Sequence, residues 1–158
     1  MKHFIICALT ALSIAAPLPV LAQEVVADDV LIIMPADDVV LAEFQWEARV
    51  ITVFADSPRD PAFARQIELL AERPDALVER DVIVLTDTDP AAKSDVRTQL
   101  RPRGFALVIV DKDGRVMLRK PDPWDVREIS RAIDKTTLRQ QEIKEEKEAA
   151  RAASGTQG

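Results

Sequence analysis

Four segments of the chain carry the residue pattern of β-strands. Residues 50–55, 82–85 and 105–110 are short, nearly continuous apolar runs rich in β-branched side chains, which is typical of strands buried on both faces of a sheet. Residues 115–120 follow a turn-forming sequence at 111–114, so we expect them to form a hairpin with the preceding strand. The pattern therefore predicts a largely buried sheet of four strands.

Three amphipathic helices are predicted between and after these strands. Apolar side chains recur every three or four residues in the segments that follow Asp60, Asp89 and Asp122, which is the spacing of one helix face. Each of these aspartates is followed by proline. Because Asp accepts hydrogen bonds from free N–H groups and Pro needs none in the first turn, we expect three N-caps rather than three catalytic acids.

The resulting element order, β-α-β-α-β-β-α, predicts an α/β domain of the thioredoxin-like, peroxiredoxin-related class. Such a domain has a mixed four-stranded sheet with helices on both faces, and we assign it to residues 44–143. Residues 23–43 form an acidic N-terminal arm, with a weak edge strand as one interpretation. We expect residues 144–158, which are charged and lack an apolar stripe, to be a disordered tail.

The first 22 residues have the features of a secretory signal. Lys2 and His3 are a short basic start, residues 4–16 are an apolar core, and residues 20–22 offer small side chains for cleavage. We therefore expect a periplasmic or secreted protein. The apolar core is too short to be a stable membrane span, and an uncleaved anchor is the alternative interpretation.

Cleavage of this signal would remove much of the reactive chemistry. Cys7 is the only cysteine and His3 the only histidine of the chain, and there is no tyrosine. The remaining domain would have no disulfide, no thiolate nucleophile and no imidazole base. The chain has 21 basic and 27 acidic residues, a net charge of −6 that becomes −7 without Lys2. This balance argues against nucleic acid as a partner.

One edge of the predicted sheet gathers the charged loops. In a thioredoxin-like topology, the loops after the first, second and fourth strands and the loop before the third lie together, and ligands prefer such strand-end edges. The residues placed there are Asp56, Ser57, Arg59, Asp87, Arg101, Arg103, Gly104, Lys120 and Trp124.

Each candidate at this edge has a structural alternative. Asp56, Asp87 and Asp89 could hold Ca²⁺ or Mg²⁺, but caps and turns account for them better. Three arginines, Arg59, Arg101 and Arg103, could bind a carboxylate or phosphate; we favour the alternative that they neutralise Asp56 and Asp87. Ser57 stands where a nucleophile would, without a histidine to activate it. Trp124 is either a core residue, which we favour, or an exposed anchor for a partner.

Several segments resemble one known family, the bacterial exported branch of the thioredoxin-like DUDES domains, which is related to domains of vertebrate equarin and sushi-repeat matrix proteins. The similar segments are residues 54–58, 79–90, 104–114, 118–134 and 138–143. The resemblance implies a peroxiredoxin-related fold and export, and it supplies no activity and no catalytic residues. The chain departs from redox relatives at Gly104, which stands where they have proline directly before the third strand.

We therefore expect a non-catalytic binding or adaptor module with no cofactor, no metal site and no catalytic residue. Its expected ligand is a partner protein or a small anion, held at an edge formed by Asp56, Ser57, Arg59, Asp87, Arg103 and Trp124. The alternative is a divalent-metal-binding protein or a carboxylate-dependent enzyme that uses the same edge. Thiol–disulfide or peroxidase chemistry is not expected, because both need a thiolate.

Overall fold

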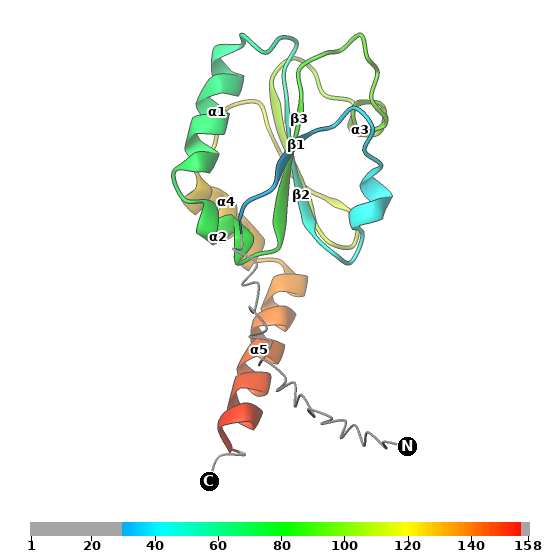
Figure 1. The fold of residues 1–158 in the computed structure, drawn as a ribbon. Helices are drawn as coiled ribbons and strands as arrows, with labels where there is room; N and C mark the ends of the chain where they lie inside the picture. Colours follow the sequence, from blue (N-terminus) through cyan, green and yellow to red (C-terminus); the bar gives the residue numbers. More distant parts are fainter. Residues whose placement is uncertain (1–29, 156–158) are drawn as a thin grey trace, which may run out of the picture.

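The computed structural model describes residues 30–155, which form a layered α/β body with one helix projecting from its lower end (Figure 1). The predicted signal, with Cys7 and His3, lies outside the described residues. So do the first part of the acidic arm and residues 156–158. Among residues 30–155, no helix is both long enough and apolar enough to cross a membrane.

The centre of the body is a five-stranded sheet in the order β1-β3-β2-β4-β5. Its strands are β1 (Ile33–Pro35), β2 (Arg49–Phe54), β3 (Val82–Asp87), β4 (Ala106–Val110) and β5 (Val116–Lys120). The pairs β1–β3 and β2–β3 are parallel, whereas β4 runs antiparallel to both β2 and β5. The mixed sheet and the thioredoxin-like class were thus predicted correctly.

The prediction of four strands was one too few, because the acidic arm supplies β1. Ile33 and Met34 pair in register with Val84 and Leu85 of β3, and the N–H of Ala36 continues the pairing to the Thr86 carbonyl at 2.9 Å. The strand has only three residues and ends at a proline. So short a segment carries little periodicity of its own, and pairing with β3 determines it.

Helices cover both faces of the sheet, each over its own apolar cluster (Figure 1). Helices α1 (Pro61–Ala71), α2 (Pro74–Val78) and α4 (Val126–Asp134) lie on one face, and α3 (Asp95–Leu100) and the short η1 (Leu41–Phe44) lie on the other. Strand β2 divides its side chains between the two clusters. Ile51 and Val53 belong to the first, whereas Val50 and Phe54 belong to the second, as the two-residue repeat of a strand requires.

Only one of the three predicted Asp-Pro caps is a cap. Asp60 accepts hydrogen bonds from the first turn of α1 at 2.8 and 3.4 Å. Ser94 caps α3 and Asp125 caps α4, with bonds of 3.0 and 2.8 Å. Asp89 instead closes a local turn by accepting the Ala91 N–H at 2.9 Å. The prediction failed at Asp89 and Asp122 because an Asp-Pro pair suits a turn as well as a helix start.

The last helix, α5 (Thr137–Gly155), occupies most of the segment predicted as a disordered tail. Its first turns are attached to the lower end of the sheet by Arg49, whose side chain is fully buried. The Arg49 guanidinium donates to Asp111 Oδ1 at 2.9 Å, to the Arg80 carbonyl at 2.9 Å and to Glu142 Oε1 at 3.1 Å. This attachment fixes the direction in which α5 leaves the body.

Candidate functional site

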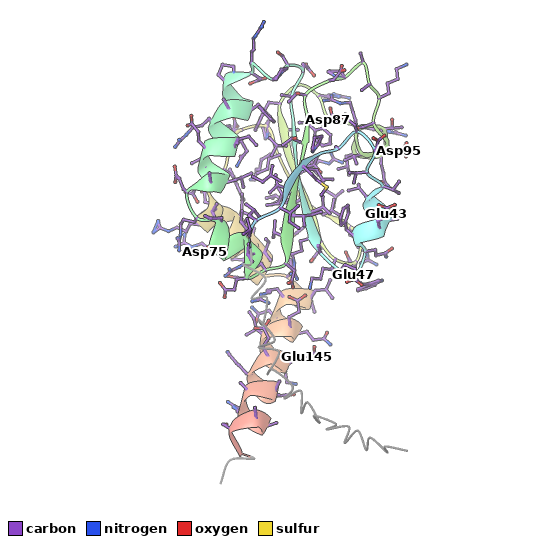
Figure 2. All side chains as sticks on the ribbon, viewed as in Figure 1. Glu43, Glu47, Asp75, Asp87, Asp95 and Glu145 are labelled. Atoms are coloured by element: carbon purple, nitrogen blue, oxygen red, sulfur yellow. The ribbon has the colours of Figure 1, made fainter. Side chains whose placement is uncertain are left out.

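The carboxylate of Asp87, at the end of β3, is buried and accepts hydrogen bonds from two side chains and from the N–H of Asp89. Asp87 is 4% exposed and lies at the upper end of the sheet in Figure 2. Oδ1 accepts hydrogen bonds from Arg97 Nη2 at 2.8 Å and Nε at 3.0 Å, and Oδ2 accepts one from Ser94 Oγ at 2.6 Å. Asp87 therefore offers little carboxylate surface to a ligand from solvent.

Arg97 contacts Asp87 at this edge, and the residue pattern did not predict this role for it. It also donates to the carbonyl of Ala55 at 2.8 Å, and its guanidinium carbon lies 5.4 Å from the centre of the Phe54 ring. Its Nη1 is 3.9 Å from Asp56 Oδ1. One arginine of α3 thus joins the end of β2, the end of β3 and the loop after β2.

The expectation that Arg59, Arg101 and Arg103 neutralise these aspartates was wrong. None of the three forms an ion pair within residues 30–155; Arg97 takes that role for Asp56 and Asp87. Arg97 directly follows the apolar Val96, and a charged residue in that position does not indicate an ion pair with Asp56 or Asp87. The Ser94-x-x-Arg97 spacing could have suggested it only with the positions of β2 and β3 known.

The loop after β2 is exposed and makes a local turn. Ser57 Oγ accepts the N–H of Arg59 at 3.2 Å, which is the turn role expected of it. The side chain of Asp56 is 64% exposed. No histidine or cysteine occurs in residues 30–155, so the described part of the chain offers Ser57 neither an imidazole base nor a neighbouring thiol.

An open cavity of about 260 Å³ lies between the loop before β4 and the end of β5, and we call it the cationic cleft. Four basic residues line it, Arg101 and Arg103 from the loop before β4 and Arg119 and Lys120 from the end of β5. The other lining residues are Pro102, Phe105, Ala106 and Pro121. The cleft is thus lined by basic and apolar residues and by no acidic one. Arg119 lies on the face of the sheet that carries Val108, and Lys120 on the face that carries Leu107.

None of these four cations is in an ion pair with another described residue, although several basic residues elsewhere are paired. Lys120 makes a different contact, because its Nζ lies 4.0 Å from the centre of the Trp124 ring. Unpaired guanidinium groups with exposed side chains are free to form charge-assisted hydrogen bonds with a carboxylate or phosphate.

Trp124, whose ring contacts Lys120 of the cleft, is positioned by Gln66 of α1. The buried Gln66 side chain donates to the Trp124 carbonyl at 2.9 Å and accepts the Trp124 N–H at 2.8 Å. The ring packs at the margin of the first apolar cluster and remains partly exposed. It therefore packs against the core, as favoured for it, while the role of an anchor for a partner stays a prediction.

Gly104 links the cleft to the loop after β2. It has a φ of +59°, and a Cβ built on it would lie 3.9 Å from Asp56 Oδ2. Of the six residues predicted to form a binding edge, Arg103 lines the cleft and Trp124 contacts its Lys120. Asp56 lies near Gly104, the residue that follows Arg103 in the chain. Asp87 is hydrogen-bonded to Arg97, whereas Ser57 and Arg59 are bonded to each other in the turn after β2.

The acidic residues of this edge do not converge. Within residues 30–155, no three His, Cys, Asp or Glu side chains are placed so that they could hold a metal ion together. Asp89, a third candidate ligand, accepts hydrogen bonds in its own turn. The arrangement offers cations to an anion rather than oxygens to a cation.

A family model described as "Domain of unknown function (DUF4174)" matches residues 40–142. This match spans more than half of the chain. The chain belongs to the DUF4174 family. No curated protein sequence matches it significantly.

The fold of the DUF4174 domain is similar to that of redox proteins. The reduced 2-Cys peroxiredoxin of Plasmodium vivax superposes with a TM-score of 0.52 at 18% identity, over 65% of this chain and 84% of the peroxiredoxin. The exposed lipoprotein thioredoxin Etrx1 of Streptococcus pneumoniae gives a TM-score of 0.48 at 14% identity, over 61% and 90% of the two chains. At these identities the similarity concerns the fold alone.

Proposed function

We propose that the DUF4174 domain is a non-catalytic binding module that holds an acidic segment of a partner protein in the cationic cleft. The observation that carries the proposal is a cavity whose lining includes Arg101, Arg103, Arg119 and Lys120 and no acidic residue. Such a lining is notable on a chain whose net charge is −6. Repulsion between neighbouring cations is relieved when an anion binds beside them.

The apolar floor favours a peptide over a small inorganic anion. Phe105, Pro102 and Pro121 line the same cavity as the cations, and a phosphate ion would leave this apolar surface in water. A short segment with acidic residues on both sides of an apolar side chain would cover the floor and pair with the cations. Burial of apolar surface together with charge-assisted bonds is the usual composition of a peptide site.

The absence of suitable groups supports a role without catalysis. Thiol chemistry needs a thiolate, and the only cysteine, Cys7, falls in the predicted signal. At the predicted edge, the buried carboxylate of Asp87 is already bonded to Arg97 and Ser94. In this proposal the protein works after export, in the periplasm or outside the cell, where its partner would also be found.

The alternative of a metal-binding protein or carboxylate-dependent enzyme is less well supported by this geometry. It requires carboxylates that are open to a ligand, and Arg97 contacts both Asp56 and Asp87. The two functions are separated by adding Ca²⁺ or Mg²⁺ during thermal unfolding, because a cation bound to the native state raises the melting temperature. We expect no change in melting temperature.

The proposal is tested by calorimetric titration of the chain without its predicted signal. The probe is an acetylated, amidated Glu-Glu-Phe-Glu-Glu peptide, and inorganic phosphate is titrated in parallel. We expect the peptide to bind more tightly than phosphate, and the Arg103→Ala/Arg119→Ala variant to lose at least about tenfold in affinity. The matched control, Arg127→Ala/Arg131→Ala on α4, removes the same charge elsewhere and should change the affinity less than about twofold. Equal losses in the two variants would overturn the proposal.

A further inference from the structure

A second hollow lies at the opposite end of the sheet, and we call it the acidic groove. It is an open cavity of about 830 Å³ beside the start of β1, the start of β3 and helix α2. The register places it far from the cationic cleft. Ala106, in the cleft, pairs with Phe54 at the end of β2, whereas Val82, in the groove, pairs with Arg49 at its start.

The floor of the groove is apolar and partly uncovered. Val30, Ile32, Val78 and Val82 are among its lining residues. The residue exposures of Val30 and Ile32 are 70% and 51%, unusually large for aliphatic side chains next to a buried sheet. Exposed apolar surface of this kind, when rimmed by polar residues, is characteristic of interaction sites.

The rim of the groove is acidic. Glu47, Asp75, Glu79 and Asp81 line it, and no basic residue does. Glu79 pairs with Arg80 at 3.1 Å and Asp81 with Lys112 at 2.7 Å. Glu47 and Asp75 form no ion pair with any of residues 30–155, and Figure 2 places both at the lower end of the body, opposite Asp87.

We propose that the acidic groove binds a basic amphipathic segment of a partner protein, one in which Lys or Arg alternates with apolar side chains. The occupant is inferred from charge complementarity with the unpaired Glu47 and Asp75 and from the apolar floor. A free polyamine would satisfy the carboxylates and leave Val30 and Ile32 exposed. A segment with both kinds of side chain covers the floor and reaches the rim.

The chain's own sequence is a poor occupant. The residues directly before Val30 include Glu24, Asp28 and Asp29 and no basic residue, so their charge has the same sign as the rim. The proposal is independent of the cationic cleft, since the two surfaces share no residue. Together they would allow one domain to hold an acidic and a basic segment at the same time, which is the arrangement of an adaptor.

The test is calorimetric titration of the chain without its predicted signal, using an acetylated, amidated Lys-Leu-Lys-Leu-Lys-Leu peptide. A second peptide, with Ser in place of Leu, separates charge from apolar contact. We expect the Leu peptide to bind at least about tenfold more tightly than the Ser peptide, as it alone buries the floor. Equal affinities of the two peptides would overturn the proposal.

Two variants locate the binding. Glu47→Gln/Asp75→Asn should lower the affinity for the Leu peptide about tenfold, and Ile32→Ser should lower it about fivefold. The matched control Asp37→Asn/Glu43→Gln removes the same charge from exposed positions outside the groove and should have little effect. Loss of binding in the control, or none in Ile32→Ser, would contradict the site.

The variants also separate this proposal from the first one. Glu47→Gln/Asp75→Asn should retain full affinity for the acidic Glu-Glu-Phe-Glu-Glu peptide, which confirms that it is folded and that its cationic cleft is intact. Conversely, the Arg103→Ala/Arg119→Ala variant should bind the Leu peptide with the same affinity as the unchanged chain. If light scattering shows that the unchanged chain self-associates and that the Leu peptide dissociates the assembly, the occupant is a second copy and the proposal is wrong.

Discussion

Arg97 and Asp87 form a doubly hydrogen-bonded ion pair at the end of β3, with Nη2 and Nε at 2.8 and 3.0 Å from one carboxylate oxygen. The side chains are 12% and 3% exposed. Arg97 also reaches the Ala55 carbonyl, so the pair closes the ends of β2 and β3 together. As a result, the buried Asp87 carboxylate is not available to a ligand, whereas the unpaired cations of the cleft are.

Removal of Arg97 should therefore destabilise the domain strongly. Arg97→Ala leaves the Asp87 carboxylate buried with only Ser94 and main-chain contacts, which should lower the free energy of unfolding by about 3–5 kcal/mol. Urea denaturation measures this loss. Adding Asp87→Asn to the variant should recover part of it, because the unpaired charge is removed. Arg119→Ala, an exposed change, should stay within about 0.5 kcal/mol, and a similarly small loss for Arg97→Ala would contradict the structural role.

Gln66 should hold the Trp124 segment against α1. Its side chain makes both hydrogen bonds to the Trp124 backbone, at 2.9 and 2.8 Å, and it is buried. Gln66→Ala leaves that N–H and carbonyl without these partners, at a cost of about 1–3 kcal/mol. Amide hydrogen exchange at Trp124 should become faster than in the unchanged chain. The control is the exposed Gln99→Ala, and equal exchange rates in the two variants would refute this role.

Acid should weaken the attachment of α5 through Glu142. Partial burial alone would raise the pKa of Glu142, but hydrogen bonds from Arg49 and Lys112 outweigh burial and lower that pKa below its usual value. A carboxyl whose pKa is lower in the folded state contributes stability above its unfolded pKa, and this contribution is lost as pH falls through the folded value. The free energy of unfolding should therefore decrease on acidification.

A variant isolates this contribution. Glu142→Gln should lower the free energy of unfolding at neutral pH by about 1–3 kcal/mol and should flatten its decrease in acid, as measured by urea denaturation at a series of pH values. Glu148→Gln, an exposed change on the same helix, should reproduce the unchanged pH profile. An unaltered acid profile in Glu142→Gln would show that other carboxyl groups cause the decrease.

Gly104 should tolerate no ordinary side chain without strain. Its φ of +59° is left-handed, where a Cβ costs about 1–2 kcal/mol. Gly104→Ala should lower the free energy of unfolding by about that amount, and Gly104→Asn by less, because Asn enters this region more readily. Gly155→Ala, with nothing within 4 Å of the added Cβ, serves as the control. Equal stabilities of Gly104→Ala and Gly104→Asn would indicate crowding rather than backbone strain.

The sequence predicted the elements whose signal is local. Apolar runs such as residues 50–55 and 105–110 marked β2 and β4 closely, because strands buried on both faces need apolar side chains at nearly every position. β1 was not firmly predicted, because three residues are too few to show the alternation of a strand. Residues 144–155 form helix with no apolar stripe, so composition alone predicted disorder there.

The candidate site was predicted only in part, for a different reason. Arg103, Lys120 and Trp124 were expected at one edge of the sheet, and they lie near one another there because the topology alone brings their loops together. The partners of Asp87 were missed because they depend on where α3 packs over the ends of β2 and β3. Gln66, on the buried face of α1, looked like any polar residue in a helix. Long-range hydrogen bonds of this kind have no signature in residue spacing.

The most direct measurement is chemical-shift mapping by heteronuclear NMR, with the isotope-labelled chain titrated with the Glu-Glu-Phe-Glu-Glu peptide. Binding in the cationic cleft predicts that the backbone amides of residues 101–106, apart from Pro102, and of 119–120 shift together with the Trp124 indole. The amides around Glu47 and Asp75 should stay unchanged. Shifts confined to other surfaces, or no shifts at low ionic strength, would contradict the assignment of this edge as the binding site.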